Sequence, residues 1–274
     1  MDRGSTASRG GKLEKFMRIA NIYPVANQEF YKEEDYVMIL AHLLKYYKRE
    51  SFRPDAYIIC DNGLYEEAQV STSLQSVIDL IEASDVGPLV TEIIIPDTAN
   101  DIKDTIRLFE ENIETVKKYI GKYVFMFVAQ ATTYDELRYG INYINQYVGT
   151  IPNLSIGFSK LSPLDRASDE AVEIIKTAKY PVHCLGLKLS FGEMKKLAPY
   201  IRGCDSSQLA YIVKNEEAVP EDAVDYVRDG RREDGRGTIK DIELETDILD
   251  TEKTRQFRAA IMKQLAEKLE FVGW

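Results

Sequence analysis

The chain has 274 residues, and its 35 Lys and Arg against 45 Asp and Glu give a formal net charge of −10. This excludes a surface that is basic all round, which non-specific nucleic-acid binding usually requires, but it leaves room for a local basic patch. Hydrophobic residues make up 45% and charged residues 29% of the chain, as is typical of a folded globular protein with a large core.

The cysteines are Cys60, Cys184 and Cys204, widely spaced within apolar runs and without a CxxC or CxC pair. We expect three buried thiols in a reducing, cytoplasmic compartment, and neither a metal nor another cofactor. No window approaches the roughly 18 consecutive apolar residues that span a bilayer, so no membrane association is expected. Residues 1–16 lack the apolar segment of a signal peptide and are interpreted as a flexible leader or tag.

Short β-rich runs alternate along the rest of the chain with stretches of helical spacing. Strands are predicted at 18–25, 56–63, 90–97, 122–130, 154–159, 182–187 and 201–205, with a doubtful eighth at 209–213. Residues 31–47 place Tyr36, Ile39, Leu40, Leu43, Leu44 and Tyr47 on one face, which predicts a helix. Further helices are predicted after Ser71 or Ser73, from Ile102, and at 134–148, 169–178, 191–197 and 251–271.

This alternation predicts an α/β protein with a (β/α)8 barrel, a fold that typically fills about 250 residues. Residues 17–274 are therefore expected to form one domain, with a polar insertion at about 215–240. The C-terminal ends of the strands form the active-site face of such a barrel. The predicted strands end in Asp61, Asp97, Gln130 and Asp205, so we expect these side chains to meet at one end of the barrel.

Each of these positions also has a structural explanation. Asp61-Asn62-Gly63 is a good turn sequence, and a strand-end acid such as Asp205 can cap a helix. Gly157, in the middle of a strand, is typical of a close approach by a backbone or a ligand. The recurrence of polar residues at strand ends favours a catalytic site.

The polar insertion carries the main basic cluster of an acidic chain, formed by Arg228, Arg231, Arg232 and Arg236. A solvated surface loop would explain this composition, because acidic residues and glycines are interleaved with the arginines. A segment that contacts nucleic-acid phosphates would explain it as well.

The strand-end residues resemble, in order and spacing, those of the tRNA-guanine transglycosylase superfamily, and the resemblance covers about residues 58–207. That family exchanges a guanine in nucleic acid for a 7-deazaguanine on a (β/α)8 barrel. Similar segments are Asp61-Asn62-Gly63 (its Asp-x-Gly), Asp97 (its purine-binding aspartate), Gln130 (its Gln-Gly) and Ile156-Gly157-Phe158 (its base-reading backbone). His183-Cys184-Leu185-Gly186, Glu193 and Gly203-Cys204-Asp205 resemble its Leu-Met-Gly, Pro-Glu and Gly-Val-Asp motifs.

The resemblance implies a pentosyltransferase in which Asp205 is the nucleophile and Asp61 carries protons. It implies base binding by Asp97, with Gln130 and Gly157 at the purine O6, and by the neighbouring Asn62 and Gly63. The implied partners are DNA or tRNA and a free guanine or 7-deazaguanine base. No cofactor is implied.

This chain departs from the family pattern after Cys204, where neither Cys nor His follows. The zinc subdomain that helps the family to hold tRNA is therefore missing, and the chain resembles shortened members that are phage-encoded or linked to DNA modification. Because the net charge is acidic, a homodimer or a helper protein that supplies nucleic-acid affinity is a further hypothesis.

Two other functions fit the same strand ends. A barrel hydrolase or lyase acting on a small sugar or phosphorylated substrate would use the same carboxylates. A catalytically inert barrel that serves as a binding protein would not need them, and the chain keeps three acids at strand ends. A metal ion held by Asp61, Asp97 and Asp205 is not favoured, because no histidine or dense carboxylate motif accompanies them.

Overall fold

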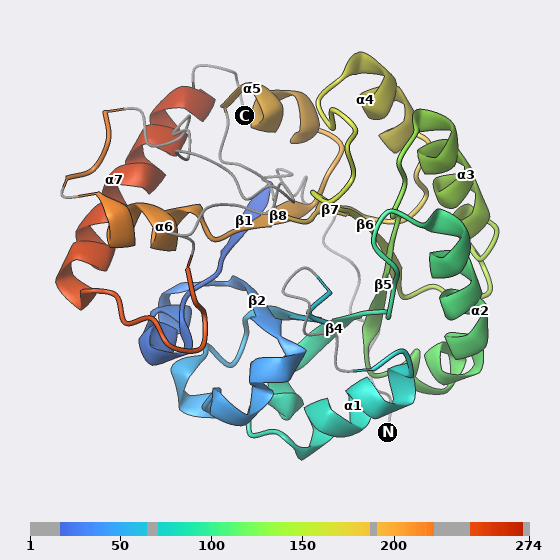
Figure 1. The fold of residues 1–274 in the computed structure, drawn as a ribbon, viewed down its shortest axis with the longest axis horizontal. Coiled ribbons are helices and arrows are strands. Elements are labelled where there is room, and N and C mark those ends of the chain that lie inside the picture. Colours follow the sequence, from blue (N-terminus) through green and yellow to red (C-terminus); the bar gives the residue numbers. More distant parts are fainter. Residues whose placement is uncertain (1–16, 65–70, 187–190, 217, 222–241, 271–274) are drawn as a thin grey trace, which may run out of the picture.

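Eight parallel strands form a nearly closed barrel surrounded by helices (Figure 1). The computed structural model describes residues 17–64, 71–186, 191–216, 218–221 and 242–270. The strands are β1 (Arg18–Asn21), β2 (Tyr36–Leu40), β3 (Tyr57–Asp61), β4 (Val90–Ile94), β5 (Val124–Val128), β6 (Leu154–Phe158), β7 (Val182–Cys184) and β8 (Gly203–Ser206). Their order is β1-β8-β7-β6-β5-β4-β3-β2, and β1 packs beside β2. The predicted (β/α)8 fold is confirmed.

Helices follow most strands and cover the outside of the barrel. They are α1 (Leu74–Ala83), α2 (Ile102–Tyr119), α3 (Tyr134–Asn145), α4 (Asp169–Ile175), α5 (Phe191–Leu197), α6 (Gln208–Asn215) and α7 (Thr251–Glu270). Short 3-10 helices are η1 (Val25–Glu33), η2 (Ala41–Tyr46), η3 (Arg49–Ser51) and η4 (Gly87–Leu89). The helices α1 to α4 each begin at a side-chain cap that accepts a backbone N–H, formed by Ser73, Asp101, Thr133 and Ser168.

The predicted helix at 31–47 is wrong, because its middle is strand β2. All five residues of β2 are buried, since one face points into the barrel and the other packs under the outer elements. A short run that is apolar on both faces has no period that separates strand from helix. The apolar residues of η2 then extended the apparent helical spacing.

The doubtful strand at 209–213 is also wrong, because these residues belong to helix α6. Residues 208–213 are all buried, as α6 lies between the barrel and α7. Residues 209–213 form an unbroken apolar run, and periodicity alone cannot assign such a run to a buried strand or to a helix. The other predicted strands and helices are found close to their predicted ranges.

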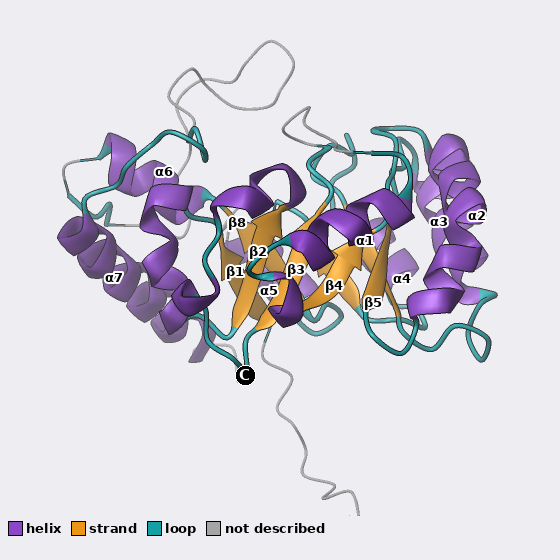
Figure 2. Ribbon diagram, turned by 90° about the horizontal axis from the view of Figure 1, so that it is seen from below, coloured by secondary structure: helices purple, strands orange, loops and turns teal. Residues whose placement is uncertain are grey.

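Helix α7 packs beside α6 and completes the outer layer next to β1, as Figure 2 shows from a second side. Phe257, Ile261 and Leu265 are buried at the predicted helical spacing. Arg258 connects α7 to Glu34, the residue after η1, because Arg258 Nε donates to Glu34 Oε1 at 2.9 Å. The same oxygen accepts from Tyr23 and Asn21.

The barrel interior is apolar in its middle and polar at its N-terminal end. The apolar part consists of Ala20, Ile22, Tyr36, Met38, Ile59, Ile94, Met126 and Val128. At the N-terminal end the fully buried Glu92 accepts from Arg202 and from Ser155. Arg202 also donates to the Tyr57 hydroxyl at 2.9 Å. The buried ion pair between Arg202 and Glu92 therefore occupies a part of the interior where barrels usually have branched aliphatic residues.

The three cysteines are free and fully buried in the core between strands and helices, and burial raises the pKa of Cys184 to about 12. The expectation of buried thiols is confirmed. None of the helices in the described ranges is long and apolar enough to cross a membrane. The predicted leader (residues 1–16) and the four arginines of the polar insertion lie outside the described residues.

Candidate active site

The predicted site residues lie at or near the C-terminal ends of neighbouring parallel strands, and most of them fall into two hydrogen-bonded clusters. Asp61 ends β3, whereas Asn62, Asp97 and Gln130 follow β3, β4 and β5. Gly157 is in β6 and Asp205 in β8. The first cluster joins Asn62, Asp97 and Gln130, and the second joins Asp205 to His183 and Gly186.

In the first cluster the Asp97 carboxylate lies between two side-chain amides. Asn62 Nδ2 donates to Asp97 Oδ1 and Gln130 Nε2 donates to Asp97 Oδ2, each at 2.5 Å. The Asn62 amide is itself fixed, because Nδ2 also donates to the Ile95 carbonyl and Oδ1 accepts the Leu64 N–H. Burial raises the pKa of Asp97 to about 6, an effect that the two amide hydrogen bonds reduce but do not cancel.

Gln130 is oriented toward Asp97 in the absence of a bound base. A partner for the purine O6 must donate, and one of the two N–H groups of Gln130 Nε2 already donates to Asp97. Its Oε1 is buried and has no hydrogen-bond partner in the described part of the chain. A buried acceptor without a partner is costly, so Gln130 is poised to accept from a bound molecule or to turn its amide when one enters.

Asp61 forms a local turn with the glycine that follows it. Asp61 Oδ1 accepts the Gly63 N–H at 2.9 Å, and Gly63 has a φ of 84°, in the left-handed region that favours glycine. The turn interpretation of Asp61-Asn62-Gly63 is therefore confirmed. The same turn places the Asn62 amide against Asp97. The position of Asn62 in the site therefore depends on this turn.

Gly157 makes room for side chains of the barrel interior. A Cβ at this position would lie 2.9 Å from Met126 Sδ, 3.0 Å from Val128 Cγ2 and 3.2 Å from Leu185 Cδ1. Its carbonyl accepts the Ala129 N–H at 2.8 Å as part of the sheet. The close approach expected at this glycine thus involves side chains rather than a backbone.

In the second cluster the buried Asp205 carboxylate receives hydrogen bonds from the neighbouring strand β7 and the turn after it. The Gly186 N–H lies 3.0 Å from both carboxylate oxygens, and His183 Nε2 lies 3.1 Å from Oδ1. The other ring nitrogen of His183, Nδ1, is 2.7 Å from the Tyr36 hydroxyl. His183 and Tyr36 are both fully buried. Oδ1 therefore has two partners and Oδ2 shares one.

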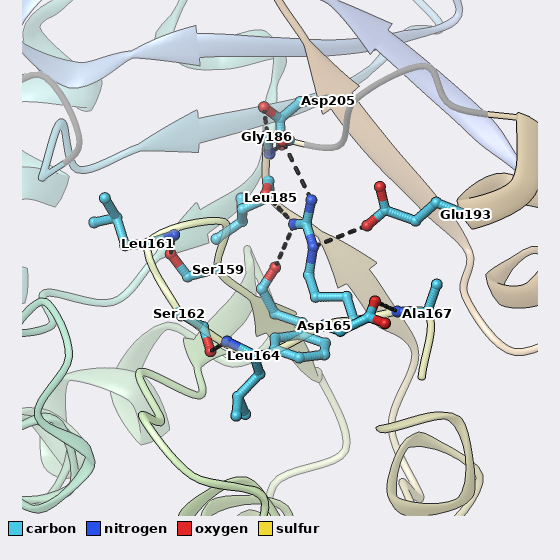
Figure 3. Close-up of polar contacts among 12 residues, drawn as sticks. Ser159, Leu161, Ser162, Leu164, Asp165, Ala167, Leu185, Gly186, Glu193 and Asp205 are labelled. Carbon is cyan, nitrogen blue, oxygen red and sulfur yellow. Dashed lines mark hydrogen bonds and ion pairs between the residues drawn. The ribbon is translucent and has the colours of Figure 1, made fainter. Parts of the chain in front are cut away.

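A buried arginine braces the turn that carries the Gly186 N–H. Figure 3 shows Leu185 and Gly186 of this turn beside Asp205. Arg166 Nη1 donates to the Leu185 carbonyl at 2.6 Å and Nη2 to the Gly186 carbonyl at 3.4 Å. Its Nε donates to Glu193 Oε1 at 3.2 Å, in an ion pair that is largely buried. Gly186 has a φ of 62°, so the turn also depends on a residue without a side chain.

Sequence reasoning missed His183, Tyr36 and Arg166 as members of this site. His183 lies in an apolar strand and was interpreted only as part of a motif, and Tyr36 was assigned to a helix. Arg166 had no recognisable signal, because its main partners are backbone carbonyls. Within the described ranges, no group of three or more His, Cys, Asp or Glu residues is arranged to hold a metal ion.

A scan against protein-family models finds no model that matches the chain, and a search of curated proteins finds no match. Because a (β/α)8 barrel supports many unrelated chemistries, the function has to be argued from the two clusters of the site.

Proposed function

We propose that this chain is a transglycosylase that exchanges a guanine-type base in nucleic acid through a covalent intermediate on Asp205. One observation carries the proposal: two carboxylates at the same end of the barrel are held in different environments. Among the described residues, Asp205 Oδ1 has two hydrogen-bond partners, whereas Oδ2 shares only the Gly186 N–H. Asp97 is buried between two amides and has a raised pKa. Such a difference suits separate roles for two acids.

The first step breaks the bond between the base and the sugar. Asp205 Oδ2 adds to C1′ of the target nucleotide as the C1′–N9 bond breaks, and the bonding electron pair passes to N9 of the leaving guanine. N9 then takes a proton, for which Asp61 is the proposed carrier. A covalent step of this kind replaces one difficult displacement by two easier ones.

The second step reverses the first with a different base. The incoming 7-deazaguanine gives its N9 proton to Asp61, and N9 attacks C1′ while the bond from C1′ to Asp205 breaks. The Asp205 carboxylate is thereby regenerated, and the two successive inversions retain the configuration at C1′. The net reaction consumes no cofactor.

Asp97 is the proposed anchor of the base. Ionised, it offers two oxygens in one plane to the N1–H and the 2-amino group of a guanine. Binding would release the Gln130 amide from Asp97, so that its N–H could turn to the purine O6. Asn62 would remain as the fixed support, because its amide is held from both sides.

The proposed substrate is a nucleotide within DNA or tRNA, and it must leave its base stack to reach the barrel. The arginines of the polar insertion are proposed to contact phosphates, and a homodimer or a helper protein would add affinity that an acidic chain lacks. The residues that follow Cys204 contain neither Cys nor His, and this favours a substrate other than the tRNA bound by family members with a zinc subdomain.

The test is exchange of radiolabelled guanine into tRNA and into double-stranded DNA, run side by side. Wild-type protein should label one of the polymers, and Asp205→Ala should label neither, because it lacks the attacking oxygen. Asp79→Ala is the matched control, since Asp79 is an exposed acid on α1 that bonds only to Gln75 in the described structure. Folded wild-type protein that labels neither polymer would contradict the proposal.

A further inference from the structure

We infer that His183, held by Tyr36, is the residue that positions Asp205 for attack and reserves Oδ2 as the attacking atom. The inference rests on the proposed function in so far as Asp205 is the nucleophile. The hydrogen-bonded chain itself, from Tyr36 through His183 to Asp205, is independent of any substrate.

The hydrogen bonds determine which ring nitrogen of His183 carries the proton. An ionised carboxylate can only accept, so His183 Nε2 must donate to Asp205 Oδ1. In a neutral imidazole Nδ1 is then an acceptor, and the Tyr36 hydroxyl at 2.7 Å is its donor. Burial raises the pKa of Tyr36 above its ordinary value, which keeps the hydroxyl proton in place. The Tyr36 hydroxyl and both ring nitrogens of His183 thus each have a hydrogen-bond partner.

Tyr36 contacts His183 across the barrel interior because a glycine lies between them. Tyr36 is on β2 and His183 on β7, with β1 and β8 between them in the sheet. The ring crosses this gap over Gly203, where a Cβ would lie 2.8 Å from Tyr36 Cε1 and 2.7 Å from the Arg18 carbonyl. The Arg18 guanidinium lies 4.3 Å from the Tyr36 ring centroid and fixes the ring further.

His183 acts through Asp205 rather than on the substrate. It is level with Gly203 in the sheet, so it lies two residues below Asp205 along the strand direction, and it is fully buried. Its bond to Oδ1, together with the Gly186 N–H, leaves Oδ2 with one shared donor among the described residues. These bonds hold the carboxylate in one orientation, with Oδ1 more fully occupied than Oδ2.

The first experiment reads the tautomer directly. The chain has two histidines, so a long-range ¹H–¹⁵N spectrum of histidine-labelled protein contains two ring systems, and His42→Gln assigns them. At neutral pH we expect a protonated Nε2 and an unprotonated Nδ1 for His183. Protonation at Nδ1, alone or together with Nε2, would overturn the inference. This result does not depend on catalytic activity and therefore stands apart from the proposed function.

The second experiment separates positioning from folding. His183→Leu removes the donor to Asp205, and we expect kcat for base exchange to fall about 100-fold with an unchanged KM for the base. His183→Gln keeps a donor near Nε2 and should stay within about tenfold of wild type. His42→Gln is the control and should exchange at the wild-type rate.

The outcomes of this comparison distinguish the two claims. Folded His183→Leu protein with wild-type kcat, or an equal loss in the Leu and Gln variants, would overturn the positioning role. Absence of exchange by wild-type protein would overturn the proposed function, whereas the tautomer spectrum would still decide how Asp205 is held. Thermal melting of each variant shows whether it is folded.

Discussion

Asp97 and Asp205 differ in what surrounds each carboxyl group. Asp205 Oδ1 is met by the His183 ring and by the Gly186 N–H, whereas Asp97 is met by two side-chain amides. Neutral amides compensate a buried charge only in part, and burial raises the pKa of Asp97 to about 6. Asp97 therefore changes its charge nearer to neutral pH than an ordinary aspartate does.

Base exchange should lose efficiency in acid because of Asp97. A protonated carboxyl presents a donor to the donor edge of a guanine, so the ionised form has to bind the base. With a pKa of about 6, we expect kcat/KM for the base to fall about tenfold between pH 7 and pH 5. The measurement is a pH profile of initial exchange rates. A wild-type profile that is flat between pH 5 and pH 7 would show that Asp97 does not bind the base.

The same raised pKa predicts how Asp97 affects stability. Between pH 4 and pH 6 the folded protein keeps a proton on Asp97 that the unfolded chain has lost, so this contribution to stability falls as the pH rises. It is fully present below pH 4 and absent above pH 6. The free energy of unfolding of Asp97→Asn, measured relative to wild type, should therefore rise by about 2–3 kcal/mol between pH 4 and pH 7. Urea unfolding at several pH values tests this, and a difference that does not vary with pH contradicts it.

At the level of elements, the barrel interior depends on a buried ion pair at its N-terminal end. Arg202→Met leaves Glu92 as an unpaired buried charge and should cost about 3–5 kcal/mol of unfolding free energy. The double variant Glu92→Leu with Arg202→Met removes both charges and should recover most of that loss. Urea unfolding of both single variants and the double variant gives the coupling. Additive losses would mean that the pair is not coupled.

The contact between β2 and β8 depends on a glycine. In Gly203→Ala the new Cβ would meet the Tyr36 ring and the Arg18 carbonyl, and the carbonyl belongs to a strand that cannot move freely. We expect a loss of about 1–3 kcal/mol and a disturbed His183 tautomer. Gly121→Ala is the control, because a Cβ there meets no atom within 4 Å. Equal stability of the two variants would show that Tyr36 does not lie against Gly203.

The elements that were predicted correctly share a pattern that local sequence can show. Strands such as β4 are apolar runs that stop at a proline and an acid, and the next helix begins at a capping side chain. Strand β2 and helix α6 were misassigned because both are covered on all sides, which removes the periodic signal. In both cases the residues are buried by elements that are distant in the sequence. The local residue pattern does not indicate that burial.

The site likewise contains residues that the local sequence predicts and residues that it does not predict. Asp97, Gln130 and Asp205 were predicted because a polar residue at the end of an apolar strand is visible in the sequence. The bond between Tyr36 and His183 joins residues that are 147 positions apart and on strands that are not neighbours. A single sequence offers no signal for such a pair, so only the closed barrel reveals it.

At the scale of the whole molecule, the net charge of −10 opposes binding to a polyanion. The exposed arginines Arg107, Arg138 and Arg255 on the described helices already pair with neighbouring acids. Such paired arginines contribute little attraction to phosphates at a distance. The four arginines of the polar insertion are therefore the proposed source of nucleic-acid affinity.

Replacement of Arg228, Arg231, Arg232 and Arg236 by Gln should weaken nucleic-acid binding and its dependence on salt. Each phosphate contact that is lost lowers the slope of log K against log salt by about 0.9, so the slope should fall by up to about 4. The control replaces four exposed, ion-paired arginines, namely Arg53, Arg107, Arg138 and Arg255, which changes the net charge equally. Binding is measured by fluorescence anisotropy at several salt concentrations. An equal loss of affinity in both variants would indicate that the net charge, and not the insertion, governs binding. Unchanged binding in both variants would indicate that a partner protein supplies the affinity for nucleic acid.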